Sequence, residues 1–211
     1  MYNCFEVEKS GIDNLKKFSK FVDKTIEKEI KEQNQILKQI SNITDSESEE
    51  ILIKNTKSTI RSLKKYKNDL RLSMVGLIYS HIEFGLVKIC DEIQKQSDLK
   101  LTLKDFSEKG LSQFSKFMTY TKDTDFSQKH RKLFSDVIKI QKIRNILVHR
   151  LGELNPGDNE LVNYIKNDPY ISCINNKIVL DKKFIRFAIK TAKNVIYSVE
   201  KFVYESTQDP F

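Results

Sequence analysis

The sequence contains little that would interrupt a helix or cross-link a small fold. Only three prolines and six glycines occur in 211 residues, and tryptophan is absent. Because proline and glycine are the strongest helix breakers, their scarcity predicts long helices. The three cysteines are odd in number, widely spaced and without a CxxC motif, so they predict neither a disulfide framework nor a zinc site.

Targeting and membrane signals are missing as well. The N-terminal stretch "MYNCFEVEKSG" has no basic segment followed by an apolar one, which a secretory signal peptide would need. No uninterrupted apolar run approaches the roughly 18 residues that a membrane-spanning helix requires. We therefore expect a protein of the reducing cytoplasm, with no membrane partner.

Positive charge is in excess. Lys and Arg number 37 against 29 Asp and Glu, which gives a formal net charge of +8. This balance fits an anionic partner, of which nucleic acid is the most common. Lys, Ile and Asn are abundant throughout, however, so the lysine-rich composition of an AT-rich genome explains the charge equally well.

Apolar periodicity predicts an all-α protein with one small β-hairpin. Apolar side chains recur at steps of three or four residues, as on one face of a helix. Two β-favouring runs, "YISCI" and "KIVL", flank Asn175 and Asn176, which tolerate the positive φ of a hairpin turn. The expected helices cover residues 12–43, 47–96 (one helix or a bent pair), short pieces within 98–126, 127 to about 150, a short helix capped by Asp158, and a last helix from the capping Asp181 to about 205.

A basic ridge runs beside the apolar stripe of the helix expected over residues 47–96. Its cations recur at helical spacing, one residue out of phase with the apolar positions: Lys54, Lys57, Arg61, Lys64 and Arg71. The ridge could follow the phosphates of an RNA backbone. More commonly, such a charge run is a solvated face whose long stems cover the edge of the core.

The segment "MVGLIYSHIEFGLVKIC" is apolar on nearly every side, which predicts a buried or interfacial helix. Glu83 interrupts it and needs a cation or a hydrogen-bond donor, because an unpaired buried carboxylate is costly. His81 is expected to be a core or interface histidine, and Cys90 a core thiol.

The stretch "IRNILVHRLG" combines groups suited to phosphoryl chemistry. Asn145 and His149 are four residues apart, so they share a helix face, and the long side chain of Arg144 can reach round to them. Arginine binds phosphate through two hydrogen bonds, and histidine is the side chain best suited to proton transfer near neutral pH. Gly152 is expected to end the helix.

These groups fit metal-free cleavage of RNA. His149 would move a proton at the 2′-hydroxyl or the leaving 5′-oxygen, and Arg144 would stabilise the phosphorane-like transition state. No acidic cluster suggests a metal, and no cofactor is expected. As an alternative, His149 is a surface cation favoured by the helix dipole; Arg150 is a phosphate contact or completes that dipole. His130, in "QKHRK", is expected at the surface in a first helical turn, without a role.

The motif "RNILVHR" resembles the R-x4-6-H signature of the HEPN domain superfamily, in which Asn often follows the Arg. "YSHIEFGLVKICDEI" looks like the buried second helix of such domains, which often carries an acidic residue facing the motif; Glu83 would be that residue. The resemblance covers about residues 47–205. We therefore expect a HEPN-like domain over 46–211 with a helical extension over 1–45, or one continuous domain.

The resemblance implies an antiparallel helical bundle that forms a homodimer, with the motifs of two chains in one cleft. Many such proteins are metal-independent endoribonucleases of toxin–antitoxin or anti-phage defence systems, which implies RNA and an antitoxin or defence protein as partners. Arg144 and His149 would be the catalytic pair, supported by Asn145 and Glu83. The alternative is a HEPN-fold RNA-binding or interaction module without catalysis. Leu151 replaces the Tyr of a His-x-Tyr motif, which argues against the tyrosine-AMPylated subfamily.

Overall fold

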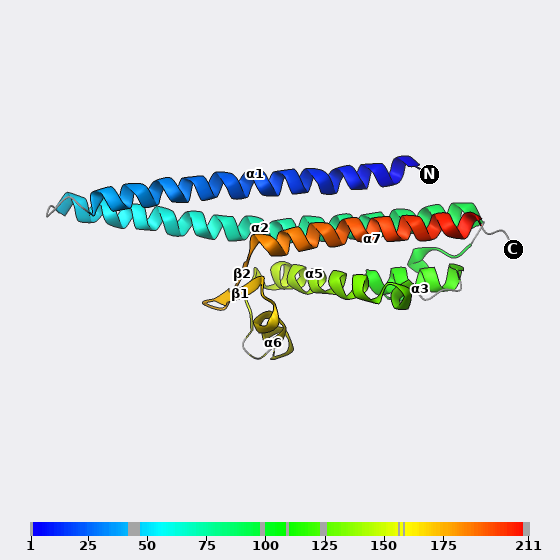
Figure 1. The fold of residues 1–211 in the computed structure, drawn as a ribbon. Coiled ribbons are helices and arrows are strands. Elements are labelled where there is room, and N and C mark those ends of the chain that lie inside the picture. The colour runs from blue at the N-terminus through cyan, green and yellow to red at the C-terminus, as the bar shows by residue number, and fades with distance from the viewer. Residues whose placement is uncertain are drawn as a thin grey trace.

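Long antiparallel helices dominate the protein (Figure 1). The computed structural model describes residues 2–41, 47–97, 100–108, 110–122, 126–155, 157 and 159–208. Its elements are α1 (Tyr2–Ile40), α2 (Glu47–Ser97), the 3-10 helix η1 (Leu103–Asp105), α3 (Leu111–Lys122), α4 (Phe126–Lys129), α5 (Arg131–Arg150), α6 (Asn159–Asn167), β1 (Ile171–Ile174), β2 (Lys177–Leu180) and α7 (Lys182–Gln208). The predicted all-α class with a hairpin before the last helix is confirmed.

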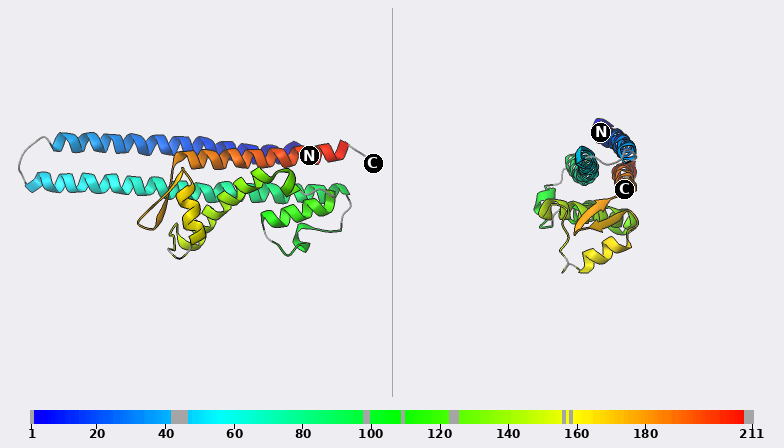
Figure 2. Two further views of the ribbon diagram at one scale, coloured as in Figure 1. Left: turned by 60° about the horizontal axis from the view of Figure 1, so that its bottom comes forward. Right: turned by 90° about the vertical axis from the view of Figure 1, so that its left-hand side faces the viewer.

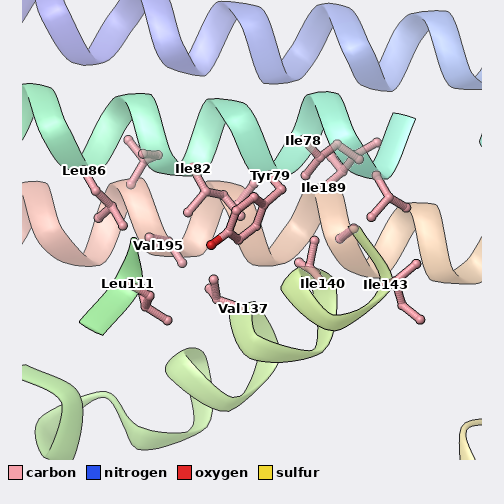
Figure 3. Close-up of a cluster of buried hydrophobic side chains, with 14 of the residues drawn as sticks. Ile78, Tyr79, Ile82, Leu86, Leu111, Val137, Ile140, Ile143, Ile189 and Val195 are labelled. Carbon is pink, nitrogen blue, oxygen red and sulfur yellow. The ribbon is translucent and has the colours of Figure 1, made fainter. Parts of the chain in front are cut away.

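The core forms around α2, against which α1, α5 and α7 pack. Figure 3 shows where α2, α5 and α7 meet: Ile82, Ile140 and Ile189 come from these three helices. From α1, Ile12 enters the same core and is 0% exposed. The N-terminal helix therefore shares its buried surface with α2 and α7. The domain boundary expected at residue 46 lies outside the described residues.

Beyond the start of α7, only α1 and α2 continue side by side (Figures 1 and 2). We call this two-helix stretch, residues 28–40 and 47–66, the arm. Its buried side chains lie on one narrow stripe of each helix; Ile40, Thr56 and Ile60 are 8%, 5% and 7% exposed. Spacing of three and four residues along such a stripe is that of a coiled-coil seam. The arm is therefore stabilised by the contact between its two helices.

Helix α1 begins well before residue 12, so the predicted start is wrong. The helix runs through Gly11, a residue that usually weakens helices. A Cβ at this position would lie only 2.6 Å from Cε1 of His81 on α2. Gly11 therefore allows close packing of α1 on α2, which outweighs its poor helix propensity. His81, expected in the core or at an interface, is half-buried against α1, and α2 is one helix rather than a bent pair.

The helix expected from residue 127 is divided into α4 and α5. His130 separates them, with φ −116° and ψ 33°, and it is half-buried at the N-cap of α5. Burial, together with the charge of Lys129, lowers the pKa of His130. The expectation of a first-turn surface histidine is therefore wrong, because the backbone leaves the helical conformation at this residue.

The hairpin matches its prediction. Strand β1 pairs with β2 in antiparallel register, and the turn residues Asn175 and Asn176 have φ of 50° and 61°. Asp181 caps α7 by accepting a hydrogen bond from the Lys183 amide at 2.7 Å. Helix α2 fixes the hairpin through Asn68, whose side-chain amide bonds the Ile178 carbonyl at 2.8 Å and the Leu180 amide at 2.9 Å. The expected cap Asp158 lies outside the described residues.

One window of α2, within Ser48–Lys95, is long and apolar enough to cross a membrane by length and composition. No membrane-spanning helix was expected from the sequence, because no uninterrupted apolar run is long enough. Half of the window, 50%, is buried inside the protein. The core helix of a protein without any membrane contact has the same composition, so this feature alone does not place the chain in a membrane.

Candidate functional site

The hairpin anchors the C-terminal end of α5, which carries the "RNILVHR" motif. The backbone turns into the left-handed region at Leu151 (φ 49°) and stays there at Gly152 (φ 82°). The Gly152 amide bonds the Ile146 carbonyl at 3.3 Å, and the Gly152 carbonyl accepts the Ile178 amide of β2 at 3.0 Å. The last helical residue is Arg150 and Gly152 stands just past the helix end, as predicted, while Leu151 adopts the left-handed conformation at a steric cost.

Arg144 and Asn145 meet on α5 next to α2. The guanidinium carbon of Arg144 lies 5.8 Å from the ring centroid of Tyr79, within the range of a cation–π contact. Nη1 of Arg144 donates to Oδ1 of Asn145 at 3.2 Å. Arg144 is half-buried and Asn145 exposed. Two of the predicted site residues are therefore held together within one chain.

His149 is exposed in the last turn of α5, and its neighbour Arg150 is exposed as well. Among the described residues, no hydrogen bond or ion pair joins His149 to Arg144, Asn145 or Glu83. The imidazole shares a helix face with Asn145, four residues before it. It is therefore open to a partner or substrate from outside the chain.

A polar cluster that includes Glu83 and Tyr79 lies at Gly110, just before the start of α3. A Cβ placed on Gly110 would lie 3.4 Å from Oε1 of Glu83, 3.5 Å from the Tyr79 hydroxyl and 3.8 Å from Nε2 of Gln141. Three polar groups from α2 and α5 therefore converge on a glycine whose φ is 62°. The Tyr79 ring is the surface on which Arg144 rests.

Tyr79 is the residue that sequence reasoning missed. It is 2% exposed, and its hydroxyl has no hydrogen-bond partner in the described part of the chain. Burial, and then the nearby Glu83 carboxylate, raise the pKa of Tyr79 well above its usual value, and Arg144 lowers it. The signal was available in the sequence, because Tyr79 precedes Glu83 by one helical turn.

Glu83 is half-buried rather than buried as its apolar surroundings in the sequence predict. No ion pair within 4.0 Å joins it to Arg144 in the described structure. Both charges instead affect the phenol of Tyr79: the Glu83 carboxylate raises its pKa and the Arg144 guanidinium lowers it.

Replacing Tyr79 tests this arrangement. Tyr79→Phe removes a buried hydroxyl without a hydrogen-bond partner, so we expect the free energy of unfolding to stay unchanged or rise by up to about 1 kcal/mol. Tyr79→Ala removes the ring as well and should cost about 3–5 kcal/mol. Urea unfolding of both variants measures this. A loss above about 1 kcal/mol in Tyr79→Phe would show that the hydroxyl is bonded to Glu83 in solution.

The basic ridge is divided by the structure. Lys54, Lys57, Arg61 and Lys64 are exposed on the arm. Arg71 turns inward, with Nε and Nη2 at 3.1 and 2.7 Å from Oδ1 of Asp23 and Nη1 at 2.8 Å from the Leu180 carbonyl. Arg71 lies at the height along α2 where the hairpin ends and α7 begins, so these elements cover the face of α2 that carries it. Arg71 therefore does not belong to an exposed phosphate-binding surface.

The chemistry available near the motif is that of an imidazole, a guanidinium, an amide, a phenol and a carboxylate. Within the described residues, no group of three or more His, Cys, Asp or Glu side chains is placed to hold a metal ion. No protein-family model, curated protein or solved structure matches the chain. The resemblance to HEPN domains therefore rests on the motif and on the order of the helices.

Proposed function

We propose that the protein is a metal-independent endoribonuclease of the HEPN type, acting in a toxin–antitoxin or anti-phage defence system. The observation that carries the proposal is the exposed, anchored end of α5. It presents His149 to the outside and holds Arg144 beside Asn145, on the ring of Tyr79. An imidazole and a guanidinium on the same helix end suit proton transfer and charge stabilisation at an RNA phosphate.

In the proposed reaction, His149 takes the proton of an RNA 2′-hydroxyl. The 2′-oxygen attacks the adjacent phosphorus, the bond from phosphorus to the 5′-oxygen breaks, and a second imidazole protonates that leaving oxygen. The products are a 2′,3′-cyclic phosphate and a 5′-hydroxyl. Arg144 stabilises the charge that develops on the phosphate oxygens, and Asn145 and Glu83 support its position. Arg150 is a further predicted RNA contact, whereas the exposed arm cations Lys54, Lys57, Arg61 and Lys64 fit a solvated face.

A homodimer would supply the second imidazole. No hydrogen bond joins His149 to Arg144 in the described part of one chain, and the proposed reaction uses two imidazoles, so a complete site needs two copies of α5 that face each other. Two apolar side chains beside His149 support such a contact: Val148 is 54% exposed and Leu151 80%. Burying exposed apolar surface is what stabilises a protein–protein interface. An antitoxin or defence protein that covered the same end of α5 would control the site.

The reaction can be tested directly on the purified protein. We expect it to cleave single-stranded RNA in the presence of EDTA and to leave 2′,3′-cyclic phosphate ends, because no step requires a metal. End-group analysis of the fragments measures this. Cleavage that stops in EDTA would contradict the proposal. Salt-sensitive RNA binding without any cleavage would instead support the non-catalytic RNA-binding module.

A further inference from the structure

A second feature, remote from the motif, is a basic groove of about 890 Å³ between α1 and α7. Nine of its lining residues are cations and two are carboxylates, Asp23 and Glu27. Five of the cations form a row on α1: Lys16, Lys20, Lys24, Lys28 and Lys31. The other four form a row on α7: Lys182, Arg186, Lys190 and Lys193. We call these the α1 row and the α7 row.

The two rows face each other level by level. Lys182 approaches Glu27 at 3.8 Å, Lys193 pairs with Asp13, and Lys9 pairs with Glu200 at 2.7 Å. These ion pairs show that α7 runs antiparallel to α1. In this register Lys190 lies level with Lys20, and Arg186 level with Lys24. Like charges therefore stand opposite each other along the groove.

The carboxylates of the groove do not neutralise the middle of these rows. Asp23 is held at 2.7 Å by Arg71 from α2, and Glu27 at 2.8 Å by Lys67 from α2. These partners already account for both acids. No ion pair within 4.0 Å involves Lys20, Lys24, Arg186 or Lys190 among the residues that the structure describes, and all four are exposed. The middle of the groove is a concave surface with uncompensated positive charge.

We propose that this groove binds the phosphate backbone of a single-stranded nucleic acid. From Lys16 to Lys31 the α1 row spans about 22 Å at the rise of an α-helix, which is too long for one phosphate or one nucleotide. A positively charged groove that follows the backbone is the usual design for single strands. Ser19 and Asn194 add uncharged hydrogen-bonding groups to its lining. A flat lipid surface would contact the rims of the groove rather than its concave lining.

The groove and the motif lie on different sides of the molecule. The groove is between α1 and α7, whereas Arg144 of α5 rests on Tyr79 of α2; in the end-on view of Figure 2, α1 and α5 lie on opposite sides with α2 and α7 between them. The groove would therefore bind a strand whether or not the protein cleaves it. This inference does not rest on the proposed nuclease activity.

The experiment compares two sets of four charges in a His149→Ala background, in which cleavage does not disturb binding. One variant carries Lys20→Ala, Lys24→Ala, Arg186→Ala and Lys190→Ala in the groove. The matched control carries Lys54→Ala, Lys57→Ala, Arg61→Ala and Lys64→Ala on the arm. All eight side chains are exposed, so both variants should fold, which their thermal unfolding would verify. Fluorescence anisotropy with labelled oligouridine and oligothymidine measures affinity at several salt concentrations.

We expect the groove variant to bind about 10- to 100-fold more weakly. The slope of log K against log salt should fall by about 3, because each phosphate contact on a single strand contributes about 0.7. The arm control should change affinity less than about threefold. Similar losses in both variants, a larger loss in the arm control, or no binding at all would overturn the proposal. Groove-dependent binding to phosphatidylserine vesicles without binding to either oligonucleotide would overturn it too.

Cleavage and binding measurements distinguish a failure of the nuclease proposal from a failure of the groove proposal. If the groove variant loses binding and the wild-type protein cleaves no RNA, only the nuclease proposal fails. If the wild-type protein cleaves RNA and the groove variant binds like the control, only the groove proposal fails. A preference for oligouridine over oligothymidine, or the reverse, would identify the natural strand and support the groove in either case.

Discussion

His149→Ala should lower the rate of RNA cleavage by about 100- to 10,000-fold, the usual contribution of a general acid or base. The side chain is exposed at the end of α5, so its loss removes little packing, and the melting temperature should stay unchanged. Single-turnover cleavage at saturating RNA measures the chemical step separately from binding. RNA affinity should change little, because the proposed binding groove lies elsewhere.

His130→Ala is the matched control. His130 is half-buried at the N-cap of α5 and lies about 28 Å from His149 along the helix axis. Its cleavage rate should remain within about threefold of wild type. Equal activity of His149→Ala and the wild-type protein would eliminate His149 as the proton-transfer group. Equal losses in both histidine variants would point to a shared effect on folding.

Arg71→Ala should destabilise the protein by about 2–4 kcal/mol. The substitution removes the partner of Asp23 and leaves the Leu180 carbonyl without its bond from Arg71. The side chains of Arg71 and Asp23 are only 12% and 15% exposed, so water cannot fully replace these contacts. For a chain of this size, the melting temperature should fall by roughly 5–15 °C. Urea and thermal unfolding measure both quantities.

Arg61→Ala provides the control from the same helix. Arg61 is exposed on the arm, and surface substitutions of this kind usually change stability by less than about 0.5 kcal/mol. The double variant Asp23→Ala with Arg71→Ala should recover part of the loss, because no unpaired carboxylate then remains. Equal stability of Arg61→Ala and Arg71→Ala would show that the Asp23 contact contributes nothing in solution.

Local patterns were enough to predict the secondary structure. The spacing of apolar side chains gives the long helices, and Asn175 and Asn176 give the hairpin turn, because both signals depend on neighbours in the sequence. The errors occur where tertiary contacts decide. Gly11 stays helical because it packs against His81, and Arg71 leaves the basic ridge because Asp23 and Leu180 lie beside it.

The candidate site could be predicted only in part. Arg144, Asn145 and His149 form a local motif, so sequence alone identifies them. The place of Tyr79 beneath Arg144 depends on how α5 packs on α2. The groove forms because residues about 160 positions apart, such as Lys24 and Arg186, lie at the same height on neighbouring helices. The ion pairs between α1 and α7 fix this register. The helical spacing within each row is visible in the sequence, but the fact that the α1 row faces the α7 row is not.

The arm gives the protein a region that can open without global unfolding. Within the arm, α1 and α2 pack only against each other. Separating them there breaks no contact in the region where α1, α2, α5 and α7 pack together. The free energy of opening should rise from the free end of the arm toward Asp23 and Arg71, as in other locally unfolding units. Helix α1 also continues without a break from the arm into the groove. Because α1 is one continuous helix, bending the arm would move the α1 row relative to the α7 row.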